Sequence, residues 1–133
     1  MVISVELAAR LRDAGLEWSP TAGDRFVIPI RGLDDRIYVV SEMTIETQVL
    51  PTGSIVRFNG TTEWALDSIP QDEVIWLPHE AQLRSLLGAR FVRLEAVPDG
   101  FVVVLEDRGR TERHVDIDAE RAYARALLAI LAR

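Results

Sequence analysis

Carboxylates and arginines are the side chains of this sequence most able to do chemistry. The 133 residues include no Cys and no Lys, and all 15 basic residues are Arg. Without Cys there can be no thiol nucleophile, disulfide, Fe–S cluster or Cys-based zinc site. Without Lys there is neither Schiff-base chemistry nor the P-loop lysine that reaches nucleotide phosphates. Any catalysis would therefore rest on Asp, Glu, Arg, His and hydroxyl groups.

One short motif resembles a metal site. His79-Glu80-Ala81-Gln82-Leu83 begins like the zinc-protease helix, but Leu83 stands where the second His is required. The only other His is His114, far along the chain. No nucleophile elbow, GxGxxG pattern or EF-hand loop is present. We expect no catalytic residues, no metal and no cofactor, and we expect Glu80 to be a first-turn residue favoured by the helix dipole.

Three carboxylate pairs could serve acid–base or hard-cation chemistry. Asp34-Asp35 and Asp72-Glu73 lie in predicted loops, where Asp commonly hydrogen-bonds the backbone. Glu63 and Asp67 are spaced i, i+4, on one face of a predicted short helix whose N-terminus favours negative charge. Structural roles are the favoured interpretation, and a carboxylate-based, metal-assisted hydrolase is the alternative.

The basic cluster of the chain surrounds a predicted hairpin turn. It comprises Arg108, Arg110, Arg113 and His114, interleaved with Asp107 and Glu112. The mixture of signs favours a solvated turn.

The elements that position these residues begin with a helix capped by Ser4 and ended at Gly15, with Leu7, Ala8, Leu11 and Ala14 at helical spacing. Strands are predicted at 26–30, at an edge because of Pro29, and at 36–41. A hairpin follows, with strands at 43–49 and 54–58. A short helix is predicted over 62–69, then a buried strand over 74–77.

The last third has the clearest pattern. Pro78 suits the first position of a helix that ends at Gly88 and has Leu83, Leu86 and Leu87 on one face. A three-stranded meander is predicted over 91–97, 101–106 and 111–117, followed by a helix capped by Asp118. The apolar stripe of that helix consists of Ala119, Ala122, Tyr123, Ala126, Leu127, Ile130 and Leu131.

Together these elements predict one α+β domain over residues 1–133. We expect a mainly antiparallel sheet of about six or seven strands, with N-terminal, middle and C-terminal helices packed on it.

Charge is unevenly distributed along the chain, whose net charge is −6. Residues 1–83 hold six Arg against 13 acidic residues, whereas residues 84–133 hold nine Arg against eight. An acidic body repels nucleic acid and anionic membranes, and it favours a basic or amphipathic protein partner. We see no signal peptide or membrane span, so we expect a cytoplasmic protein. Homodimer formation is left open.

Residues 58–69 (FNGTTEWALDSI), Trp76-Leu77-Pro78 and the opening from Ser4 to Leu16 resemble a group of short actinobacterial proteins. Some of these proteins carry a pilus-assembly label without an established activity. The localisation ATPase that the label invokes needs a glycine-rich loop and lysines. The resemblance therefore implies a bacterial cytoplasmic protein and transfers no catalytic residue.

These observations favour a non-enzymatic protein-binding or regulatory module. An acidic toxin-neutralising protein is a further alternative. The candidate partner-binding residues are Asn59, Thr61, Glu63, Trp64 and Asp67. On a helix over 62–69, Trp64 falls opposite the apolar residues, with Asp67 beside it. It is then either an exposed aromatic anchor with a polar rim or a core residue covered by a neighbouring segment; both remain open.

Overall fold

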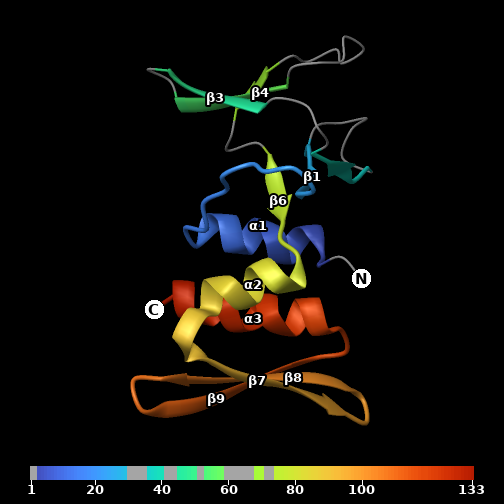
Figure 1. Ribbon diagram of the computed structural model, residues 1–133, viewed down its shortest axis with the longest axis vertical. Helices are drawn as coiled ribbons and strands as arrows, with labels where there is room; N and C mark the ends of the chain where they lie inside the picture. Colours follow the sequence, from blue (N-terminus) through green and yellow to red (C-terminus); the bar gives the residue numbers. More distant parts are fainter. Residues whose placement is uncertain (1–2, 30–35, 41–44, 51–52, 59–67, 71–73) are drawn as a thin grey trace. The chain divides into compact units, whose positions relative to one another are not determined.

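The computed structural model describes residues 3–29, 36–40, 45–50, 53–58, 68–70 and 74–133 (Figure 1). The chain divides into two compact units. Unit 1 combines Met1–Glu17 with Leu77–Arg133, and unit 2 is the intervening segment Trp18–Trp76. That residues 1–133 behave as a single domain stays a prediction.

The α+β class with mainly antiparallel pairing is confirmed. The described residues form three α-helices and nine strands in three sheets of three strands, ordered β2-β1-β6, β3-β4-β5 and β7-β8-β9. The strands are thus more numerous than the six or seven expected, and they are divided among separate sheets.

Helix α1 (Val5–Asp13) begins and ends as the sequence predicts. The Ser4 hydroxyl accepts a hydrogen bond from the amide of Leu7 at 3.1 Å. At the other end Gly15 has φ 108°, and the amide of Leu16 donates to the carbonyl of Leu11 at 3.0 Å. This Schellman pattern satisfies carbonyls that the helix end leaves free.

The meander of unit 1 is confirmed. Strands β7 (Phe91–Val97), β8 (Gly100–Asp107) and β9 (Arg110–Asp116) pair antiparallel in chain order. The central strand β8 carries the core residues of the sheet, Val102, Val103, Val104 and Leu105, all buried.

Helix α3 (Ala119–Leu131) packs on β8 and β9, while α1 and α2 (Glu80–Leu87) pack on α3 (Figure 1). Asp118 caps α3 as predicted, its carboxylate accepting from the amide of Arg121 at 3.1 Å. Ala122, Tyr123, Ala126 and Leu127 of the expected stripe are buried, and so is Ala124, which lies outside the stripe. The helix is buried on two sides because it lies between a sheet and other helices.

Helix α2 differs from the prediction at its start and on its apolar face. It begins at Glu80 with His79 as N-cap, so Pro78 precedes the helix rather than opening it. The amide of His79 donates to the side-chain oxygen of Gln82 at 2.8 Å. Leu83 and Leu87 are fully buried, but Leu86 is partly exposed because it lies at the margin of that face.

Unit 2 confirms the predicted hairpin and corrects two other expectations. Strands β3 (Ile45–Leu50) and β4 (Gly53–Phe58) pair antiparallel. The helix predicted over 62–69 is wrong at its end, since β5 (Ser68–Pro70) is a strand paired with β4. Pro70 is tolerated there because β5 is the edge strand in the order β3-β4-β5. Residues 62–67 lie outside the described part of the chain.

The second correction concerns the strand predicted at 26–30. Strand β1 (Arg25–Val27) lies between β2 (Tyr38–Val39) and β6 (Ile75–Leu77), not at an edge. Strand β1 ends two residues before Pro29, so the lack of an N–H on the proline removes no hydrogen bond from the sheet.

Candidate functional site

The predicted partner-binding residues all lie in one segment of the chain. Asn59, Thr61, Glu63, Trp64 and Asp67 all lie in 59–67, outside the described residues. The carboxylate pairs at 34–35 and 72–73 are outside them as well. All of these positions belong to the range of unit 2.

The basic hairpin turn of unit 1 is well described. Asp107 pairs with Arg110 across the end of the β8–β9 ladder, which leaves a two-residue loop of Arg108 and Gly109. Both loop residues have positive φ, 53° for Arg108 and 77° for Gly109. This is the backbone of a type I′ turn, whose hand matches the twist of the flanking strands.

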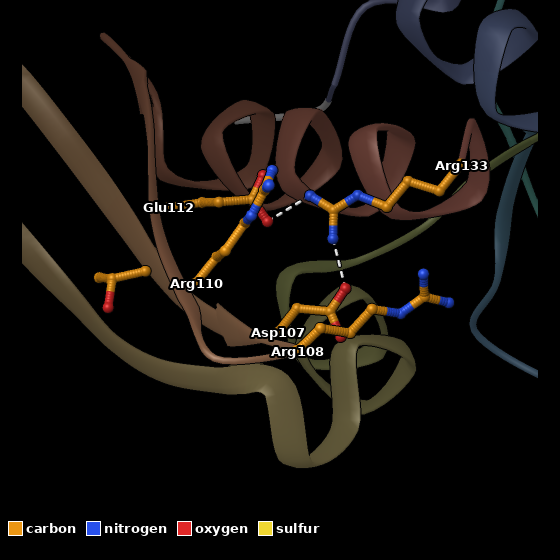
Figure 2. A pocket seen from close by; sticks show the side chains of 6 residues that line it. Asp107, Arg108, Arg110, Glu112 and Arg133 are labelled. Atoms are coloured by element: carbon orange, nitrogen blue, oxygen red, sulfur yellow. Dashed lines mark hydrogen bonds and ion pairs between the residues drawn. The ribbon is translucent and has the colours of Figure 1, made fainter.

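Arg133 reaches this turn from the end of α3. Its guanidinium donates to the carboxylates of Asp107 and Glu112, both on the face of the sheet that α3 covers (Figure 2). The hydrogen bond to Glu112 is the main reason that the pKa of Arg133 is raised above its ordinary value. The charge at this position is therefore permanent, and its orientation is set by two carboxylates.

The length of α3 explains this meeting of residues distant in sequence. A 13-residue helix spans about 20 Å, and the seven-residue strand β9 spans about 23 Å. The helix starts just after β9 ends and runs back along the sheet. Its far end therefore reaches the hairpin at which β9 began.

These groups line an open pocket of about 720 Å³ at the hairpin end of the sheet (Figure 2). The pocket is lined by Asp107, Arg108, Arg110, Thr111, Glu112 and Arg133. The lining side chains thus include three guanidinium groups and two carboxylates, a net charge of +1, and Arg133 is the one that pairs with both carboxylates.

A second cluster fastens α3 to β9. The Asp116 carboxylate is 6% exposed and accepts from Nε of Arg121 at 2.9 Å and Nε of Arg125 at 2.7 Å. Burial raises the pKa of Asp116, but hydrogen bonds from Arg125, the amide of Asp118 and Arg121 outweigh burial and leave it lowered. This arrangement is structural, because both oxygens of the buried Asp116 carboxylate accept hydrogen bonds from groups at the start of α3 or within it.

A third cluster lies on the opposite face of the sheet. Glu95 on β7 accepts from Arg93 at 2.6 Å and, across the central strand, from Arg113 on β9 at 3.0 Å. These hydrogen bonds, from Arg93 first and then Arg113, hold the pKa of Glu95 below its ordinary value. The bridge passes over Val102 and Val104, which are buried although no helix of the described residues covers this face. Long arginine stems cover such small apolar residues while their charged ends stay in water.

His114 belongs to the face under α3. Its Nε2 is buried without a hydrogen bond and lies 3.7 Å from an oxygen of Glu112. Burial lowers the pKa of His114, and Arg133 adds to the effect, while the Glu112 charge opposes it. His114 is therefore neutral at pH 7 and does not add to the basic cluster.

Unit 2 contains an aromatic row around a buried carboxylate. Trp18 stacks on Trp76 at 6.5 Å and contacts Phe26 at 5.5 Å, and Phe26 stacks on Tyr38. The Trp18 Nε1 donates to Asp24 at 2.8 Å, and Asp24 is 2% exposed. The row supplies apolar packing that the three short strands β2, β1 and β6 could not provide alone.

Sequence reasoning identified Arg108 and Arg110 but missed the pocket. The missing piece was Arg133, whose partners lie 21 and 26 positions earlier in the chain. The available signal was the length of the helix after Asp118, because it is close to the length of the preceding strand.

No family model matches the chain, and comparisons with curated proteins and with solved structures find no match. Among the described residues, no group of three or more acidic or histidine side chains could hold a metal ion. The helices of the described part are too short or too polar to cross a bilayer.

Proposed function

We propose that the chain is a non-enzymatic, cytoplasmic protein-binding module, and that unit 2 recognises a basic surface on its partner. One observation carries the proposal. Unit 2 has four Arg against nine Asp and Glu, a net charge of −5, whereas unit 1 has 11 Arg against 12 acidic residues. Nearly all the net negative charge of the chain therefore belongs to one compact unit.

Such segregation has a physical consequence for association. A unit with concentrated charge steers an oppositely charged partner and suppresses like-charged ones. The aromatic row and β-hairpin of unit 2 supply a framework on which acidic side chains can be presented. The resemblance to actinobacterial proteins with a pilus-assembly label supports a bacterial setting and names a process in which to seek the partner.

The test measures binding to a partner captured from a native bacterial lysate, identified by mass spectrometry and then purified. We expect Kd to rise with salt, and Glu63→Gln with Asp67→Asn to weaken binding and reduce that salt dependence. The matched control is Asp99→Asn with Glu106→Gln, which removes two exposed charges from unit 1. Equal effects of the two pairs, or no effect of either, would overturn the proposal.

A second variant addresses Trp64. As a binding anchor, Trp64→Ala abolishes binding and changes the free energy of unfolding by less than about 1 kcal/mol. As a core residue, Trp64→Ala costs about 3–5 kcal/mol, and the anchor assignment is then wrong.

A further inference from the structure

The pocket at the hairpin end of unit 1 carries an inference separate from partner binding by unit 2. It is formed by the turn between β8 and β9 and by Arg133 beyond α3 (Figure 2). It is an open depression of about 720 Å³, and five of its six lining residues are charged.

The three arginines of this pocket differ in their ion pairs. Arg133 is fixed by both carboxylates, Asp107 and Glu112. Within the part of the chain that the structure describes, Arg108 and Arg110 make no ion pair. Two guanidinium groups are therefore available beside a third that is already oriented.

The backbone of Arg108 supplies an independent observation. Among the described residues it is the one non-glycine residue with positive φ. The first position of a type I′ turn strongly favours Asn, Asp or Gly, and a larger side chain pays a steric cost there. Strain of this kind is commonly retained at functional positions. Here the strained position carries Arg108, which places a cation at the rim of the pocket. An unstrained Asn-Gly turn would have no cation at this position.

We propose that this pocket binds a phosphomonoester group. Guanidinium groups match phosphate in charge and in planar, bidentate hydrogen bonding. Arg108 and Arg110 are the direct ligands, and Arg133 is the oriented cation behind them. Asp107 and Glu112 hold Arg133 in place, and their negative charges offset part of the arginine charge when no phosphate is bound. The remaining volume accommodates the group that carries the phosphate, either a small metabolite or a phosphorylated side chain.

The experiment follows backbone amides 107–112 by NMR while the full chain is titrated with inorganic phosphate, ribose 5-phosphate or a phosphoserine peptide, at constant ionic strength. We expect saturable shifts, with at least about tenfold weaker binding in Arg108→Asn and in Arg110→Gln. Arg10→Gln, which removes an exposed cation from α1, is the matched control and should bind like the wild type. Tighter binding of the peptide or of the sugar phosphate identifies the source of the phosphate.

A thermal melt separates lost binding from lost structure. Asn tolerates positive φ better than Arg, so Arg108→Asn should melt at or above the wild-type temperature while losing phosphate. Shifts that do not saturate, or that are equal in Arg108→Asn and Arg10→Gln, would overturn the proposal.

Discussion

At the residue scale, Gly100 and Gly109 both allow hairpin turns, but a side chain would meet different surroundings at the two positions. A Cβ on Gly100 would lie 2.3 Å from the carbonyl oxygen of Asp116, whereas one on Gly109 would meet nothing within 4 Å. Both have positive φ. Gly109→Ala should therefore cost only the conformational strain, about 1–2 kcal/mol. Gly100→Ala should cost more, because the backbone of β9 must move. Denaturant unfolding of both variants measures the difference, and equal losses would contradict the close contact.

His114 predicts a pH dependence of stability, also at the residue scale. Its folded pKa is lowered, chiefly by burial, so the unfolded chain binds more protons between that value and about 6.5. The free energy of unfolding should thus rise with pH through this window and level off above about 6.5. Chemical denaturation from pH 5 to pH 8 should show a smaller slope in His114→Gln. An unchanged slope would mean that another group titrates.

At the element scale, the periodicity of the sequence predicts helix α3 and its apolar face. The sequence does not predict that a second side of the helix is also buried. The apolar stripe predicts one covered face, and Ala124 carries too little apolar surface to signal another. Leu127→Ala should cost about 2–5 kcal/mol by leaving a cavity, since Leu127 is 2% exposed. Ala124→Leu should cost about 1–3 kcal/mol by overpacking against neighbours on the other side. Guanidinium unfolding checks both values, and a neutral Ala124→Leu would show that this side has room.

Local signals explain which elements could be predicted. The meander and the capped helices depend on turn and cap residues close in sequence, such as Ser4, Gly15 and Asp118, and these were found. The division into three sheets depends on which strands pair with one another. A strand as short as Tyr38–Val39 has too few residues for its sequence to specify its pairing partner. The pocket forms because the end of α3 lies beside the β8–β9 hairpin, which brings Arg133 to Asp107 and Glu112. The turn residues alone do not predict this contact.

At the scale of the whole molecule, unit 2 is an insertion between two segments that complete unit 1. The core of unit 1 joins α1, α2 and α3 to the β7–β9 sheet. Replacing residues 18–76 by about 12 Gly and Ser residues, with a root-mean-square reach of about 20 Å, should leave an α+β protein that unfolds cooperatively. Circular dichroism during a thermal melt checks this expectation. Adding Leu127→Ala should lower the melting temperature, and a broad, non-cooperative melt would show that unit 1 needs unit 2.

The packing of α1 on α3 also determines when unit 1 can fold during translation. The two helices lie near opposite ends of the sequence, and unit 1 cannot form its core until both have left the ribosome. At typical elongation rates the roughly 100 residues between them take about 5–20 s to make. Throughout that interval Leu7 and Leu11 lack the cover of α3, although all of unit 2 is synthesised before the interval ends. The nascent chain therefore passes through a stage in which unit 2 has been synthesised and α1 still lacks the helix on which it packs. We expect chaperone contact with Leu7 and Leu11 to occur at that stage.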